Sequence, residues 1–321
     1  MKFFILIFLI IFINKYAYSN NLFDTKFYNI EFSSKNIEND KIQAINEIKT
    51  KSILSILKNT LTENDYVKIN TLLTDDSINT FIKNIVINDE KIINNKYISK
   101  IRINFDKKKI IEFFRINKIP YVEYLPSNIL LIIYEINGLN NNLFTINNAY
   151  YKFFIENKQN SKLFQIPNLD INDRFILKEE DIIKSDLNKI NKFSAKYNSV
   201  ENIIIIVKND KDKIIYDLII NSNGNILEKK MILNKDEMDS LYKRLEIETI
   251  NLWKQINQIQ NETLNFLNCE IKYFNIFELK EIRINLNNVS VINNINIKKL
   301  SYKSINYDIH YYGNFEILSK I

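Results

Sequence analysis

The clearest hydrophobic pattern of this chain lies between residues 100 and 138, where it predicts a strand, a helix, a loop and a second strand. Ile101, Ile103 and Phe105 alternate with polar residues, as they would in a strand with one buried face. Asp106 follows, and its carboxylate can accept a hydrogen bond from a free N–H group of the next turn. It is therefore predicted to cap a helix.

Two prolines mark the segment after this helix. Pro120 and Pro126 lack an N–H group and restrict the residue before each of them, so the chain between them is predicted to be a loop. Ile129 to Ile136 is apolar throughout, which is typical of a strand covered on both faces. We expect this strand to close the first domain.

The pattern upstream completes that domain. Residues 28–32 alternate as a strand, residues 42–56 carry one helical stripe, and residues 85–105 read as a hairpin about Asn94 and Asn95. With a short additional helix, the order becomes β-α-(α)-β-β-α-β, the split βαβ or ferredoxin-like order. A ferredoxin-like α+β domain is predicted at residues 20–138.

A second α/β unit is predicted at residues 139–262. Residues 203–207 form an apolar run typical of a buried strand, and Asn223-Gly224 is the strongest hairpin signal in the chain. Three consecutive antiparallel strands result. A long helix follows, with apolar positions from Met238 to Ile259, and packing on its own sheet is favoured over a coiled-coil seam because its stripe covers too few heptads.

The last unit, residues 263–321, begins with a predicted strand at residues 269–274 and repeats the order β-α-β-β-α, so a small incomplete ferredoxin-like unit is predicted there. A missing last strand leaves a sheet edge open, and lysines at 298, 299 and 303 could blunt that edge. Alternatively, a partner strand adds to it, or the natural chain continues with the missing strand.

The N-terminus has the pattern of a secretory signal peptide. A basic start precedes an apolar run from Phe3 to Ile13, and Ala17 and Ser19 form a small-x-small cleavage site before Asn20. Residues 1–19 are therefore predicted to be removed and the protein to be periplasmic. No later apolar run reaches membrane length without a polar residue, so no stable transmembrane segment is expected after cleavage.

Charge and cysteine content narrow the function classes. The formal net charge is +6, but the lysines alternate with acidic residues and do not form a face, so nucleic acid is not an expected partner. Cys269 is the only cysteine, which excludes an intramolecular disulfide. Stability must come from packing.

Two blocks of the chain resemble the proteobacterial family known as domain of unknown function 2066. The first block is the strand-helix-proline stretch described above, and the second combines Ile166–Asp173 with Ser194–Tyr197. The matching positions, expected to be structural, are Phe105, Asp106, Pro120, Pro126, Pro167, Leu169, Asp170 and Tyr197. The resemblance implies an exported protein and no known chemistry.

No catalytic, cofactor-binding or metal-binding set is predicted. Asp308 and His310 are expected to share one strand face, but no nucleophile motif accompanies them, and His310 is the only histidine. Three glycines in the whole chain exclude a glycine-rich phosphate loop. Asp170 and Asp173 could collect calcium, yet their spacing fits turn and helix-start chemistry better.

Two function classes remain open. The first is a non-catalytic module that binds another envelope protein or assembles with it. The second is a hydrolytic enzyme that uses the carboxylates around Asp170 and Asp173. The two classes differ in whether those carboxylates converge in a concave pocket with perturbed pKa values.

Overall fold

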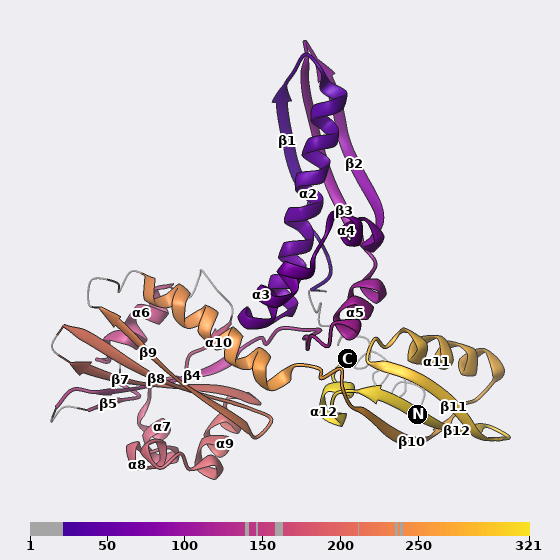
Figure 1. Cartoon of the computed structure of the whole chain (residues 1–321). Coiled ribbons are helices and arrows are strands. Elements are labelled where there is room, and N and C mark those ends of the chain that lie inside the picture. Colours follow the sequence, from indigo (N-terminus) through magenta and orange to yellow (C-terminus); the bar gives the residue numbers. More distant parts are fainter. Residues whose placement is uncertain are drawn as a thin grey trace, which may run out of the picture. The chain divides into compact units, whose positions relative to one another are not determined.

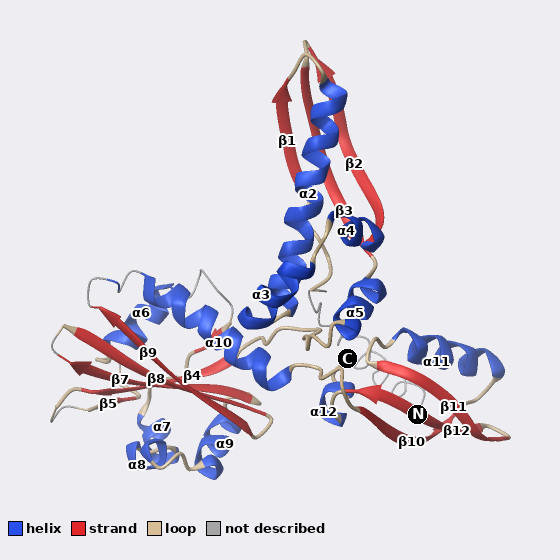
Figure 2. Cartoon of the chain, in the orientation of Figure 1, coloured by secondary structure: helices blue, strands red, loops and turns tan. Residues whose placement is uncertain are grey.

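The computed structural model describes residues 22–138, 141–145, 147–157, 163–210, 212–234, 237 and 240–321. It has the mixed α+β architecture that the sequence predicts, with helices and strands alternating along the chain (Figures 1 and 2). The chain forms two compact units, one made of the residues up to Tyr124 together with Ile259–Ile321, and one made of Leu125–Gln258. The predicted signal peptide lies outside the described residues.

The first part of unit 1 is a three-stranded antiparallel sheet with helices. Its elements are β1 (Tyr28–Ser33), α2 (Ile37–Thr60), α3 (Glu63–Leu72), α4 (Asp75–Phe81), β2 (Ile82–Ile93), β3 (Lys96–Phe105) and α5 (Lys107–Ile116). The strand order is β1-β3-β2, so β3 lies between the two strands that precede it in sequence. This is the split βαβ arrangement, as predicted. Asn94 and Asn95 make the β2–β3 turn with positive φ angles of 48° and 63°.

Helix α2 covers one face of this sheet. Its buried residues Ile53, Ile56 and Leu57 are at most 1% exposed, and on β3 the alternating residues Ile101 and Ile103 are fully buried. Alternate residues of the strand and residues three or four apart on the helix therefore pack into one core.

The strand that was expected to close this sheet lies elsewhere. β4 (Ile129–Ile136) pairs in parallel with β7 (Glu201–Asp210) inside the sheet of unit 2. Seven of its eight residues are buried, so the expected coverage of both faces is present, but a central position in the larger sheet provides it. The first sheet thus lacks the fourth strand of a complete ferredoxin-like domain.

The C-terminal part of unit 1 repeats this topology, as expected. Its elements are β10 (Leu264–Lys272), α11 (Ile276–Asn288), β11 (Ile292–Ser301), β12 (Ser304–Tyr312) and α12 (Phe315–Leu318). The strand order is β10-β12-β11 and both pairings are antiparallel. A core around Ile305, Tyr307 and Ile309 packs against Leu279 and Leu286 of α11.

Unit 2 is built on one sheet of mixed pairing. Besides β4 and β7 it contains β5 (Asn142–Leu143), α6 (Ala149–Asn157), β6 (Phe164–Gln165), α7 (Ile171–Ile176), α8 (Glu179–Ile183), α9 (Leu187–Lys196), β8 (Lys213–Ser222), β9 (Asn225–Asn234) and α10 (Leu241–Asn257). β7, β8 and β9 form the predicted antiparallel meander, and α10 contacts β8 and β9. The long helix therefore packs on its own sheet.

The units divide the chain at Tyr124 and Gln258, not at the predicted residues 138 and 262. β4 belongs to the second sheet, which moves the first division upstream. The second division follows from a short antiparallel bridge, in which Tyr121 and Ile259 exchange two backbone hydrogen bonds of 3.4 and 2.7 Å. In the part of the chain that is described, no helix is both long enough and apolar enough to cross a membrane.

Candidate functional site

The first group of candidate residues has local structural roles. Phe105 ends β3 and is 8% exposed, and Asp106 caps α5 by accepting a hydrogen bond of 2.9 Å from the Lys108 N–H, as predicted. Pro120 and Pro126 lie in the loop between α5 and β4, also as predicted. These positions shape the chain locally.

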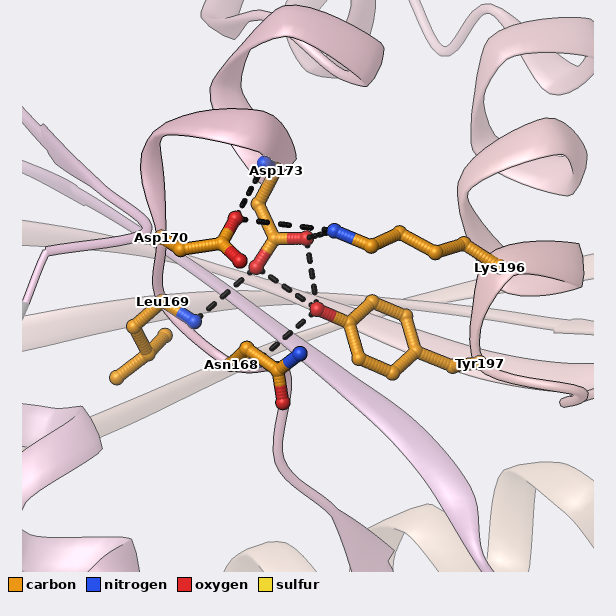
Figure 3. A network of polar contacts seen from close by, with 6 residues as sticks. All are labelled: Asn168, Leu169, Asp170, Asp173, Lys196 and Tyr197. Carbon is orange, nitrogen blue, oxygen red and sulfur yellow. Dashed lines mark hydrogen bonds and ion pairs between the residues drawn. The ribbon is translucent and has the colours of Figure 1, made fainter.

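Three candidate residues of the second group, Leu169, Asp170 and Tyr197, meet in one polar network in unit 2, drawn in Figure 3. Pro167 is buried just before the turn that carries Leu169 and Asp170, and Tyr197 directly follows α9. Asp170 caps α7 by accepting a hydrogen bond of 3.0 Å from the Asp173 N–H. Two motifs that are separate in the sequence therefore come together around the carboxylate of Asp173.

Asp173 is the centre of this network. It is 0% exposed, its Oδ2 accepts a 3.0 Å hydrogen bond from the Leu169 N–H, and its Oδ1 lies 2.6 Å from the Nζ of Lys196. The Tyr197 hydroxyl lies 2.7 and 2.8 Å from the two carboxylate oxygens and donates its one proton to them, while it accepts a 2.9 Å hydrogen bond from the Asn168 N–H. Both oxygens of this buried carboxylate are therefore engaged by donors.

The partners of Asp173 have shifted pKa values for related reasons. The hydrogen bond to Asp173 raises the pKa of Lys196 above its ordinary value, so Lys196 keeps its charge. Burial raises the pKa of Tyr197 to about 12, and its hydrogen bond to Asp173 acts in the same direction. At neutral pH Lys196 is thus an ammonium group and Tyr197 a neutral phenol.

This arrangement works against the hydrolytic interpretation. A general base must reach the proton of a substrate or of its attacking water, and both oxygens of Asp173 are buried and already bonded. A hollow of about 690 Å³ borders Tyr197, but neither Asp170 nor Asp173 lines it. The Oδ1 of Asp170 lies 3.7 Å from the Nζ of Lys196. The network is built to join α7 to the end of α9.

The remaining candidate pair lies on β12. Asp308 and His310 point to the same sheet face, as predicted, because Asp308 pairs with Asn268 and His310 pairs with Phe266 across the β10 ladder. The carboxylate of Asp308 accepts a 2.7 Å hydrogen bond from the Asn268 side chain and lies 3.9 Å from Lys298. Among the described residues, no group of three or more His, Cys, Asp and Glu could hold a metal ion.

Strand β10 offers a different kind of site, a free edge. It pairs with β12 over its full length without a register shift, from Leu264 opposite Tyr312 to Lys272 opposite Ser304. The next residue, Tyr273, donates its N–H to the Lys303 carbonyl at 3.0 Å, so odd-numbered residues bond toward β12. The N–H and C=O groups of the even-numbered residues therefore point away from β12, where no described strand pairs with them.

The other long edges carry features that discourage strand addition. β2 and β11 each contain two register shifts, and β9 carries Glu228, Lys229 and Lys230 in its middle. On β10 the first six residues are uncharged, and Leu264 and Phe266 are 50% and 74% exposed. Among these edges, β10 is the one best suited to receive another strand.

The position of this edge has a topological meaning. In a complete βαββαβ unit the last strand lies beside the first, and the first strand of the C-terminal repeat is β10. The free edge is therefore the place at which the fold would normally accept a fourth strand. The sequence pattern predicted an open edge, but it placed this strand at residues 269–274 and so missed Leu264 to Asn268.

Comparison with known proteins adds little to these observations. No protein-family model matches the chain, and no curated protein matches it. Among solved structures it is similar to the C-terminal domain of LpoB from Salmonella enterica, with 10% sequence identity and a TM-score of 0.24 over 35% of this chain and 84% of that one. A likeness at this level carries no conclusion about function, and the resemblance to the domain of unknown function 2066 family stays a prediction.

Proposed function

We propose that the protein is an exported, non-catalytic binding or assembly module of the cell envelope, and that an extended segment of a partner protein pairs with the free edge of β10. The observation that carries this proposal is the regular edge of β10, whose outward N–H and C=O groups have no partner strand among the described residues. The envelope location rests on the signal-peptide pattern of residues 1–19.

The chemistry of the edge specifies the partner segment. Main-chain hydrogen bonds would supply affinity, and alternate side chains of the added strand would supply specificity. On one face the added strand continues the side of the sheet that α11 covers, beside Leu267, Cys269 and Ile271. On the other face it meets Phe266 and Asn268, which are exposed. The expected partner is an extended segment with apolar residues at alternate positions.

A proline at Asn268 tests this proposal. The Asn268 N–H points away from β12, so proline removes a donor that the partner needs and that the sheet does not use. Asn268→Ala is the matched control, because it removes the same side chain and its hydrogen bond to Asp308 but keeps the N–H group. We expect capture of an envelope protein from a periplasmic extract to be lost with Asn268→Pro and retained with Asn268→Ala.

The result that would contradict strand addition is equal capture by both variants, since a partner that ignores the outward N–H group does not pair with this edge. Circular dichroism of each variant shows that loss of capture does not reflect loss of fold. Hydrolysis of an envelope substrate by the wild-type chain, abolished by Asp170→Asn, would overturn the non-catalytic part of the proposal.

A further inference from the structure

Several exposed apolar side chains lie at one end of the C-terminal part of unit 1, residues 264–321. Phe274, Phe277 and Tyr302 are 82%, 73% and 91% exposed, and Ile276 and Leu300 are 56% and 62% exposed. We call these five residues the aromatic tip. Several exposed apolar side chains at one place on a small unit are typical of a surface that binds something.

Backbone and side-chain hydrogen bonds place the tip residues at the same end of the sheet. The Tyr273 N–H donates to the Lys303 carbonyl at 3.0 Å, and the Tyr273 hydroxyl donates to the Ser301 carbonyl at 3.1 Å. The connection from β10 to α11 therefore lies beside the β11–β12 turn that carries Tyr302. Phe277 is in the first turn of α11, immediately after that connection.

The tip is formed by two chain reversals. Tyr302 and Lys303 form the two-residue turn between β11 and β12, with Lys303 at a φ of 65°. Phe274 precedes Asn275, the cap of α11, whose side chain accepts hydrogen bonds from the N–H groups of Phe277 and Glu278. The tip side chains are exposed at these turns, where they can enter a soft surface that has no pocket to receive them.

Positive charge surrounds the tip. Five lysines and two glutamates lie in residues 272–281 and 298–303, and all five lysines are exposed. One of the glutamates, Glu278, is engaged in accepting the Phe274 N–H at 2.6 Å. Lys272 lies two residues before Phe274 in the sequence and Lys299 directly precedes Leu300, while the Nζ of Lys303 lies 5.5 Å from the ring centroid of Tyr302. Aromatic side chains framed by lysine are complementary to a surface with an apolar interior and anionic head groups.

We propose that the aromatic tip docks on the surface of a lipid bilayer that contains anionic lipids, with Phe274 and Tyr302 entering the head-group region and the lysines contacting phosphate. This goes beyond the proposed function, because the tip lies at the Lys272 end of β10 and uses side chains that the strand-addition edge does not need. Binding at such a surface is weak and reversible, since it combines a few apolar side chains with head-group charge.

Sedimentation with vesicles tests the proposal directly. The chain that begins at Asn20 keeps every residue that the structure describes and lacks the apolar leader, which would itself bind lipid. We expect it to sediment with vesicles of phosphatidylethanolamine and phosphatidylglycerol and not with vesicles of phosphatidylcholine. The expected loss of partitioning is roughly tenfold for each of Phe274→Ser and Tyr302→Ser.

Matched controls come from the same chain. Phe175 on α7 is 74% exposed and lies in unit 2, so Phe175→Ser changes the same kind of side chain away from the tip. We expect it to leave partitioning unchanged. Lys299→Gln and Lys303→Gln should each weaken binding about fivefold at low salt. Lys213→Gln, at an exposed lysine of unit 2, should not.

Three results would overturn the proposal: no sedimentation of the wild type with anionic vesicles, equal partitioning of the tip and control variants, or capture of a protein by the tip without any binding to vesicles. Asn268→Pro should leave vesicle binding intact. Failure of strand addition and failure of lipid docking are therefore separate outcomes.

Discussion

At the scale of single residues, the structure is organised most tightly around Asp173. An ionised carboxylate is costly to bury unless it is paired and hydrogen-bonded, and Asp173 is fully buried. Lys196 supplies the opposite charge at 2.6 Å, and the Leu169 N–H and the Tyr197 hydroxyl donate hydrogen bonds. The network stabilises unit 2 only while all of these partners are present.

Removing the counter-ion should therefore be costly. Lys196→Ala leaves the Asp173 carboxylate buried with its hydrogen bonds but without the positive charge. We expect the free energy of unfolding to fall by roughly 2–4 kcal/mol, below the largest values for buried pairs because the Lys196 side chain is 27% exposed and water screens it. Urea denaturation measures this. Lys192→Ala, on the exposed face of α9, should change it by at most about 0.5 kcal/mol, and equal effects would contradict the role given to Lys196.

The tyrosine of the network should give a pH signature. The pKa of Tyr197 is about 12 in the folded chain, against about 10 for an ordinary tyrosine, so the unfolded chain loses this proton first as the pH rises. The contribution of Tyr197 is complete below about pH 10 and is lost as the pH approaches 12. We expect Tyr197→Phe to cost about 2 kcal/mol at pH 8 and progressively less above pH 10.

Urea denaturation of the wild type and the variant between pH 8 and 12 measures this difference. Tyr302→Phe is the matched control, because Tyr302 is 91% exposed. A difference between the wild type and Tyr197→Phe that stays constant up to pH 12 would show that the hydroxyl does not bond to Asp173.

At the scale of elements, local patterns predicted most of what the structure contains. Caps and turns such as Asp106 and Asn223-Gly224 are decided by one or two residues, so the sequence shows them directly. β10 was only half predicted because its first residues include the exposed Leu264 and Phe266, which spoil the alternation of apolar and polar positions. An edge strand that keeps apolar residues on its open face cannot be recognised by a rule based on burial.

The orientation of the β10 backbone leads to a paired prediction about stability. Proline at Asn268 removes an outward N–H group, whereas proline at Leu267 removes one that bonds to β12. We expect Asn268→Pro to cost about 1 kcal/mol and Leu267→Pro about 3 kcal/mol or more. Thermal unfolding followed by circular dichroism compares the two. The reverse ranking would mean that the edge assigned as free is the paired one.

At the scale of the whole molecule, sequence reasoning found repeated small α+β units but not how the chain is shared between them. Unit 1 is discontinuous, because the chain leaves it after Tyr124 and returns at Ile259. Three contacts join the two parts of unit 1. One is the bridge between Tyr121 and Ile259. The other two are hydrogen bonds, of 2.6 Å from the Asn261 side chain to the Ile119 carbonyl and of 2.7 Å from the Arg115 side chain to the Ser290 carbonyl. Contacts between residues this far apart along the chain produce no periodic pattern of apolar residues, so a single sequence does not show them.

The polar network around Asp173 was also predicted only in part. The sequence named Leu169, Asp170 and Tyr197 as structural positions, and they do meet in one network. It gave Lys196 only as part of a motif, without a role, and for Asp170 and Asp173 it favoured turn and helix-start roles while a reactive role stayed open. Burial decided the difference, because a fully enclosed carboxylate and an accessible one have the same sequence signature.

The last prediction concerns export of the whole chain. The apolar run from Phe3 to Ile13 would span about 16 Å as a helix, well short of the roughly 30 Å of a hydrocarbon core, so it fits a cleaved leader better than an anchor. We expect the exported protein to begin at Asn20, after the Ala17 and Ser19 pair. N-terminal sequencing of the protein from the periplasmic fraction checks this, and Ala17→Lys, which spoils the small residue that the signal peptidase needs, should slow processing. An intact Met1 on a membrane-retained protein would contradict both the cleavage and the periplasmic location on which the proposed function depends.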